Sequence, residues 1–184
     1  GIQEKFPNEV IKETDKINDD FSEEIEKRRD LRHLDIITID GSDAKDLDDA
    51  VYVEKTETGY KLFVSIADVS YYVKSGSELD REALKRGNSI YLVDRVIPML
   101  PRKLSNNLCS LNPDEDKLTF TVEIEFDSNG KVVKNDFYKS VIKSKYRMTY
   151  SGVNKILEGD EKLIKEYSGI YEMLKNMLSL SKSL

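Results

Sequence analysis

Five carboxylates fall within ten consecutive positions of the chain, between two short apolar runs. Residues 40–49 read Asp-Gly-Ser-Asp-Ala-Lys-Asp-Leu-Asp-Asp. Residues 36–39 before this segment and residues 50–53 after it have the composition of β-strands. Carboxylates this close together repel one another unless cations or hydrogen-bond donors neutralise them. The pattern therefore predicts a cation site between two strands, with a solvated acidic turn as the alternative.

A hard divalent cation suits this set of donors best. Mg²⁺ takes oxygen ligands, usually one or two carboxylates together with waters and substrate phosphates, and five acids suffice for the two ions used in displacement at phosphorus. The spacing does not fit a calcium-binding EF-hand loop, because the fifth and sixth positions counted from Asp40 are Ala44 and Lys45. A zinc site of the His/Cys type is excluded because the chain has only one His and one Cys.

The acidic segment resembles the metal-binding signature of the ribonuclease II/ribonuclease R family of 3′→5′ exoribonucleases, whose catalytic domain is of the RNB type. Further blocks resemble the family in the same order, at residues 29–32, 66–70, 87–91, 97–101 and 104–111. Together they span about residues 26–155. Gly41 and the triplet at residues 43–45 are closer to the ribonuclease R branch, whereas Tyr71 stands where that branch often carries His.

The resemblance implies a hydrolytic exoribonuclease that releases nucleoside 5′-monophosphates from RNA with Mg²⁺, which Mn²⁺ can replace. Asp40 and Asp49 match the carboxylates closest to the catalytic metal in the family. Asp46 matches a supporting ligand, and Asp48 matches the acid most critical for catalysis. The alternative is a non-catalytic RNA- or metal-binding module that retains the fold. An intact set of mutually repelling acids argues against a site that has lost its metal.

Two tyrosines are expected to contact RNA. Tyr91 matches an aromatic residue that stacks on the base near the RNA 3′ end, and Tyr150 matches a tyrosine near the cleaved phosphate. Stacking suits an enzyme that tolerates any sequence, since every base presents a π-face. The expected partner is therefore the 3′ end of single-stranded RNA. Residues 131–147 carry six basic residues against one acid, which indicates either a phosphate-steering surface or a solvated lysine-rich strand.

Composition indicates a well-solvated intracellular domain. The chain has 184 residues and a net charge of −6, and this length is enough for one substantial core. No apolar run approaches the roughly 20 residues that cross a membrane, so no membrane partner is expected. The single cysteine, Cys109, fits a reducing compartment and is expected to be a buried apolar residue. We therefore expect a cytoplasmic protein.

The order of the elements predicts an α+β fold with a mixed, largely antiparallel sheet surrounded by helices. Two hairpins are expected, at residues 51–54 with 60–66 and at residues 118–126 with 131–142. Helices are expected at residues 7–14, 78–86 and 149–157, and from about residue 161 to the end.

Residues 1–28 are expected to form a leading helical arm and linker, and residues 29–184 the N-terminal portion of an exoribonuclease catalytic domain. The resemblance places an additional Glu and Arg near the scissile phosphate, and the flanking OB-fold RNA-binding domains, outside this chain. The isolated chain is therefore expected to be inactive.

Overall fold

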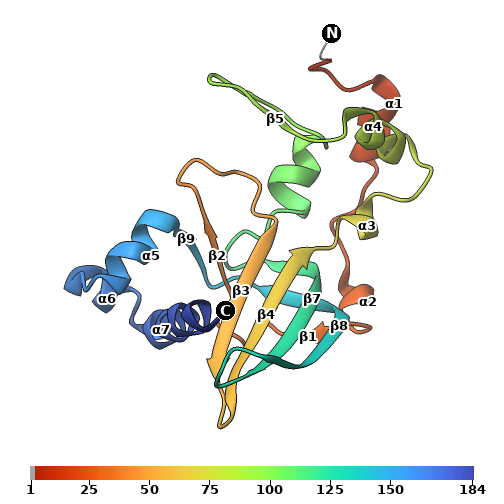
Figure 1. Cartoon of the computed structure of the whole chain (residues 1–184). Coiled ribbons are helices and arrows are strands. Elements are labelled where there is room, and N and C mark those ends of the chain that lie inside the picture. The colour runs from red at the N-terminus through yellow and green to blue at the C-terminus, as the bar shows by residue number, and fades with distance from the viewer. Residues whose placement is uncertain (1–2) are drawn as a thin grey trace.

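The computed structural model describes residues 3–184, which form a large sheet, a separate two-stranded ribbon and several helices (Figure 1). The strands of the large sheet are β1 (Arg29–Asp30), β2 (Ile37–Asp40), β3 (Asp49–Lys55), β4 (Gly59–Ala67), β7 (Asp116–Asp127), β8 (Val132–Lys143) and β9 (Tyr146–Thr149). The ribbon consists of β5 (Ile90–Tyr91) and β6 (Val96–Ile97). The helices are α1 (Asn8–Asp15), α2 (Ser22–Ile25), α3 (Val69–Tyr72), α4 (Glu78–Arg86), the π-helix η1 (Leu104–Leu108), α5 (Tyr150–Leu157), α6 (Glu161–Glu166) and α7 (Ser168–Ser183).

The large sheet has the strand order β1-β8-β7-β4-β3-β2-β9. From β8 to β2, neighbouring strands pair antiparallel. The edge strands are parallel to their neighbours, β1 to β8 and β9 to β2. The predicted α+β class with a mixed, largely antiparallel sheet is therefore confirmed.

Both predicted hairpins are present, as β3–β4 and β7–β8. Gly59 begins β4 directly beside β7, where an added Cβ would lie 2.1 Å from the carbonyl oxygen of Phe126, so the backbones approach too closely for a side chain. In the second hairpin, Asp127 Oδ1 accepts hydrogen bonds from the amides of Asn129 and Lys131 at 2.9 and 3.0 Å. Gly130 takes the positive φ of 78° that the turn requires.

The predicted helices are present, except that the one near the C-terminal end of the chain is interrupted. Helix α4 has the predicted bounds, and the side chain of Ser77 caps it by accepting the amide of Asp80 at 3.1 Å. Thr149 caps α5 in the same way through the amide of Gly152. The predicted continuous helix from residue 161 is interrupted at Tyr167, whose φ of −105° and ψ of 29° separate α6 from α7. The ring of Tyr167 packs edge-on against Tyr146, with 5.3 Å between ring centroids.

Two hydrophobic clusters lie on opposite faces of the sheet, since successive residues of a strand point to opposite sides. On one face, α5 and α7 bury a cluster over β2, β3 and β9 that includes Ile37, Met148 and Ile170. On the other face lies the largest cluster, which includes Ala50, Phe63 and Ile142 together with residues of η1. Leu47 of the acidic segment belongs to this second cluster.

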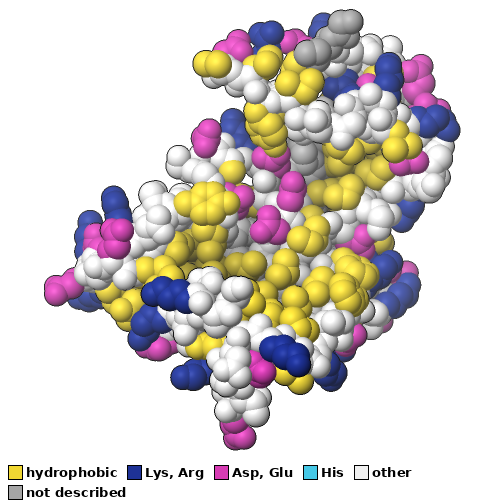
Figure 2. Space-filling model, viewed as in Figure 1, with side chains coloured by type: hydrophobic (Ala, Val, Ile, Leu, Met, Phe, Trp, Pro, Cys, Tyr) yellow, Lys and Arg dark blue, Asp and Glu magenta, His cyan; other side chains and the backbone are white. Residues whose placement is uncertain are grey.

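Part of the face that carries α7 is open. Leu180 of α7 packs on Val53 and Phe126, but the same face continues over β4, β7 and β8 without cover from residues 3–184. Ile66, Phe120 and Phe137 remain 43%, 43% and 59% exposed there. Figure 2 shows hydrophobic atoms gathered on this part of the surface. An apolar patch of this kind marks a contact surface more often than a solvent face.

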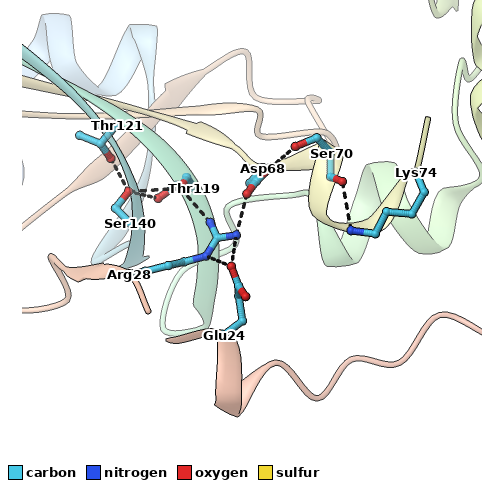
Figure 3. A network of polar contacts seen from close by, with 8 residues as sticks. All are labelled: Glu24, Arg28, Asp68, Ser70, Lys74, Thr119, Thr121 and Ser140. Atoms are coloured by element: carbon cyan, nitrogen blue, oxygen red, sulfur yellow. Dashed lines mark hydrogen bonds and ion pairs between the residues drawn. The ribbon is translucent and has the colours of Figure 1, made fainter. Parts of the chain in front are cut away.

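The segment that precedes β1 packs against the body of the molecule. Val10 of α1 is 2% exposed, and Lys103 Nζ donates to the carbonyls of residues 14, 15 and 17 at the end of α1. Further along, the buried Arg28 guanidinium donates to Asp68 at 2.7 Å, to the carbonyl of Thr119 and to Glu24 (Figure 3). The division into residues 1–28 and 29–184 stays a prediction.

Several short elements were not expected from the sequence, namely β1, β5, β6, β9, α3 and η1. All of them are too short to show a periodic pattern, and β1 and β9 in addition pair with strands that are distant in the sequence. Within residues 3–184, no helix has the length and apolar character that a bilayer crossing requires.

Candidate metal and RNA-binding site

The acidic segment connects β2 to β3 and is anchored at its middle. Asp40 ends β2 and Asp49 begins β3. Between them, Leu47 is 1% exposed and belongs to the large core cluster. Its amide donates to Ser110 Oγ at 3.1 Å, and its carbonyl accepts the amide of Leu111 at 2.8 Å. The loop is thus fixed at its middle by one buried side chain, with acids on either side of it.

Strand β9 holds the other side of the loop. Its residue Thr149 lies beside Asp40 in the parallel β2–β9 pairing. Arg147 Nη2 donates to the carbonyl of Ser42 at 3.2 Å and to that of Ala44. The carbonyl of Asp48 accepts the amide of Ala67 at 2.9 Å. Hydrogen bonds from β9 and β4 to carbonyls of the loop therefore set the positions of the carboxylates.

The acids face a cavity of about 620 Å³ between the loop, the β5–β6 ribbon and η1. Its charged walls combine five carboxylates with three cations. The carboxylates are those of Asp40, Asp43, Asp46, Asp48 and Asp94, and the cations are Lys45, Arg95 and Arg102. Tyr91, Ser105 and Asn106 add an aromatic ring and neutral polar groups. In Figure 2 acidic side chains gather in this hollow region of the surface, above the apolar patch. A cavity with both signs of charge suits an anionic ligand that arrives with a cation.

Two of the carboxylates are held in unfavourable surroundings. Burial raises the pKa of Asp40, the charges of Asp49 and Asp46 raise it further, and only Arg147 lowers it. Burial also raises the pKa of Asp48, with additional increases from Asp46, Asp49 and Asp40. Each shift shows that the ionised form lacks compensation within the chain. An added cation would supply that compensation.

The donor set fits a hard cation. Asp40 Oδ2 is buried and has no hydrogen-bond partner among residues 3–184, which is uncommon for a buried carboxylate oxygen. In the described part of the chain, no three His, Cys, Asp or Glu side chains converge closely enough to hold an ion by themselves. Mg²⁺ tolerates this, because it usually keeps waters and takes only one or two carboxylates. Asp40 and Asp48 are the residues best suited to hold it.

The ribbon reaches the acidic loop through one side chain. Tyr91, at the end of β5, donates its hydroxyl to Asp46 Oδ2 at 2.7 Å. This hydrogen bond, with burial and the charges of Asp46 and Asp48, raises the pKa of Tyr91 to about 12. Tyr91 lines the cavity and is 65% exposed, so it remains accessible to a ligand. The structure thus joins an aromatic surface to a carboxylate that was predicted to be a metal ligand.

The remaining predicted residues lie outside the cavity wall. Asp49 is exposed at the start of β3, opposite Ile66 in the register, and acts on Asp40 and Asp48 through its charge. Tyr150, the first residue of α5, is 62% exposed and follows the position beside Asp40. The structure therefore brings Asp40, Asp46, Asp48 and Tyr91 to one cavity and leaves Asp49 and Tyr150 at its margin. The roles of all six stay predictions.

Sequence reasoning missed three residues that shape the site. Arg147 was considered only as part of a basic stretch, and its contact with Ala44 joins residues 103 positions apart. Ser110, which holds Leu47, sits in a block that resembled the family but suggested no role. Arg102 lines the cavity beside η1. The only indication in the sequence was a basic residue between two blocks that resemble the family.

Cys109 is 3% exposed, and burial raises its pKa to about 12. This confirms the prediction of a buried apolar residue.

Comparison with known proteins identifies the family. A family model described as RNB domain matches residues 28–184. The chain belongs to the RNB domain family. Ribonuclease R of Thermotoga maritima is 52% identical to it over 182 residues, which cover 98% of this chain and 26% of that protein. This RNB chain thus spans about a quarter of the length of the curated relatives that it matches.

Solved structures agree with the fold of this RNB chain. Mycoplasma genitalium RNase R in complex with double-stranded RNA superposes with a TM-score of 0.88 at 38% identity, over 99% of this chain and 32% of that chain. Yeast Ssd1, described as a pseudonuclease, has a TM-score of 0.74 at 20% identity over 88% of this chain and 19% of its own. The second likeness concerns the fold alone. An RNB fold by itself therefore does not decide between a nuclease and a binding module.

Proposed function

We propose that this chain is the metal-binding part of a hydrolytic 3′→5′ exoribonuclease that releases nucleoside 5′-monophosphates from single-stranded RNA. The observation that carries the proposal is the state of the acidic loop. It places Asp40, Asp46 and Asp48 on one cavity, with raised pKa values for Asp40 and Asp48 and one buried oxygen that lacks a partner within the described chain. Identity of about half the residues with a protein named ribonuclease R supports the reaction class.

The chain's own residues would divide the work as follows. Asp40 and Asp48 hold the cation, Asp46 supports it, and Asp49 adds negative charge from the start of β3. When bound, Mg²⁺ or Mn²⁺ acidifies water and offsets negative charge on the phosphate oxygens. The exposed ring of Tyr91 offers a surface on which the base at the RNA 3′ end stacks. Arg102 lines the same cavity as the acids and carries the opposite charge. It can therefore contact a phosphate of the RNA strand.

A second candidate is a non-catalytic module that binds RNA or metal. The position of Tyr150 bears on it, because this predicted RNA contact is not among the residues that line the cavity. The retained acids argue against it, because a protein that no longer binds a cation gains nothing from carboxylates with raised pKa values.

A chimaera tests the proposal. Residues 1–184 would replace the matching quarter of Thermotoga maritima ribonuclease R, and release of nucleoside 5′-monophosphates from RNA with a single-stranded 3′ end would be measured with Mg²⁺. We expect hydrolysis by the chimaera, and a loss of at least about 10²-fold in rate for Asp48→Asn. RNA affinity should stay nearly unchanged, since stacking and backbone contacts lie elsewhere.

The matched control is Asp127→Asn in the β7–β8 turn, which leaves the cavity untouched. A chimaera that binds RNA as tightly as the parent enzyme but releases no mononucleotides would favour the binding module. The chain on its own is expected to bind Mn²⁺ without degrading RNA, because the resemblance places two further catalytic groups outside it.

A further inference from the structure

The β5–β6 ribbon is firmly attached at its base and free at its tip. At the base, Ile97 is 7% exposed, and Arg86 Nη1 donates to the carbonyl of Pro98 at 3.1 Å. At the tip, Val93 is fully exposed. The ribbon forms its own two-stranded sheet and stands away from the large one (Figure 1). Two-stranded ribbons have little stability of their own, so their position depends on the contacts that they make with neighbouring elements.

One polar contact joins this ribbon to the acidic loop. Among the described residues, the hydrogen bond from the Tyr91 hydroxyl to Asp46 Oδ2, at 2.7 Å, is the only hydrogen bond or ion pair between residues 90–97 and residues 40–49. Within the described chain, the other polar side-chain contact that the ribbon makes beyond itself is the pair of Arg95 with Glu4 of the N-terminal segment, at 2.8 Å. The position of the Tyr91 ring over the cavity therefore depends on Asp46.

The same contact fixes Asp46. A carboxylate has two oxygens, and the Tyr91 proton occupies only Oδ2. No described residue donates a hydrogen bond to Oδ1, which leaves this oxygen available to a cation. Carboxylates that bind metals are usually held in this way by a second hydrogen bond, and loss of such a partner typically weakens metal binding 10–100-fold.

We propose that Tyr91 is a positioning residue whose hydroxyl, through Asp46, couples cation binding in the acidic loop to the placement of the β5–β6 ribbon. The inference rests on the proposed function, in which Asp46 supports the cation and the Tyr91 ring receives the RNA 3′ end. Stacking would use only the ring of Tyr91, whereas the coupling gives its hydroxyl a separate role. Because coupling between two sites is reciprocal, a bound cation should hold the ribbon, and loss of the hydroxyl should weaken the cation.

Calorimetric titration of the 184-residue chain with Mn²⁺ tests the first half of this coupling. Tyr91→Phe keeps the ring and removes the hydroxyl, and we expect its dissociation constant for Mn²⁺ to rise about 10-fold. Tyr60→Phe is the matched control, since it removes a hydroxyl that donates to Ser179 Oγ at 2.7 Å, away from the cavity, and should leave the Mn²⁺ affinity unchanged. Circular dichroism would verify that both variants keep the fold.

Hydrogen exchange tests the second half. In the wild type, Mn²⁺ should slow amide exchange in a peptide covering residues 90–97, and in Tyr91→Phe this protection should disappear. A simple structural role for the hydroxyl would change exchange equally with and without Mn²⁺, which would overturn the coupling.

The outcomes separate the two proposals. If wild type binds Mn²⁺ and Tyr91→Phe binds it equally well or more tightly, the inference is wrong and the proposed function stands. If wild type binds no Mn²⁺, the metal site of the proposed function fails and the coupling fails with it.

Discussion

Asp68 and Asp40 lie at the ends of strands in the same sheet, yet the chain treats their carboxylates in opposite ways. Burial alone would raise the pKa of Asp68, but hydrogen bonds from Ser70 and Arg28 and the charge of Arg28 bring it below its usual value. Figure 3 shows the Arg28 guanidinium held between Asp68 and Glu24. Asp40 has burial and two acidic neighbours, and its pKa is raised. The comparison separates a carboxylate that is neutralised by a cation within the chain from one whose ionised form is left destabilised by its neighbours.

The two surroundings differ in whether the carboxylate is free to contact a further ligand. The Arg28–Asp68 pair is closed, because both side chains are almost fully buried and each has several hydrogen bonds. The acidic loop is open, because its backbone is fixed by Leu47 and Arg147 while its carboxylates face a cavity. The molecule thus places a structural ion pair and a candidate ligand site on the same sheet.

The largest effect is expected at the closed pair. Arg28→Met leaves the Asp68 carboxylate buried without its cation, and removal of one partner from a buried pair typically costs about 3–5 kcal/mol. Urea denaturation at pH 7 measures the free energy of unfolding. The control is Arg81→Met in an exposed pair with Glu78, which should cost less than about 1 kcal/mol. Equal costs for the two variants would show that burial does not make the Arg28–Asp68 pair more important for stability than an exposed pair.

The open site should respond to added metal. Mn²⁺ at about 100 times its dissociation constant should stabilise the wild type by roughly 2.7 kcal/mol through mass action. Asp48→Asn combined with Asp49→Asn should abolish most of this gain in a thermal unfolding experiment, whereas Asp127→Asn should keep it. A double variant that responds to Mn²⁺ as strongly as the wild type would identify the acidic loop as a solvated turn.

The anchor of the loop can be tested separately. Ser110→Ala removes the hydroxyl that accepts the buried amide of Leu47, and an unsatisfied buried amide costs about 1–3 kcal/mol. We expect both a lower free energy of unfolding and a smaller stabilisation by Mn²⁺, because the carboxylates lose their fixed backbone. If only the free energy of unfolding falls, the hydroxyl supports the core and not the site.

The smallest effect concerns pH in the absence of metal. The pKa of Asp48 is raised on folding, so its ionised form costs stability above that pKa, and the cost disappears as pH falls through it. Asp48→Asn should therefore raise the free energy of unfolding at pH 7 by less than about 1 kcal/mol, seen as a slightly higher melting temperature. This gain in stability should shrink toward pH 4. For Asp68, whose pKa is lowered, the stabilising contribution is present at pH 7 and is lost as pH falls below about 4.

Melting curves in EDTA at several pH values would check both signs. At pH 7, Arg28→Met should melt below the wild type and Asp48→Asn above it. Both differences in melting temperature should become smaller as the pH falls. An Asp48→Asn variant less stable than wild type at pH 7 would contradict the assigned repulsion.

Local patterns predicted most of the fold. The alternation in residues 118–126 and the turn before Gly130 indicated the β7–β8 hairpin, and the predicted helix at residues 78–86 is α4. Strand β9 was missed because Tyr146–Thr149 is short and its partner β2 lies far away in sequence. The contact between Tyr91 and Asp46 was missed for the same reason, since it joins residues 45 positions apart. The candidate acids were predicted from their density and a family resemblance, but neither could show which of them share a cavity.

The parallel pairing of β2 with β9 also has a consequence for the order of folding. The acidic loop is complete early in the chain, but its clamp, Arg147, comes 103 residues after Ala44. Bringing such distant segments together costs loop entropy before any contact compensates for it, and non-local pairings of this kind slow folding. We therefore expect the contacts from Arg147 and β9 to fix the loop after the nearby pairing of β3 with β4 has formed. Cation binding would then be among the last properties that a refolding molecule acquires.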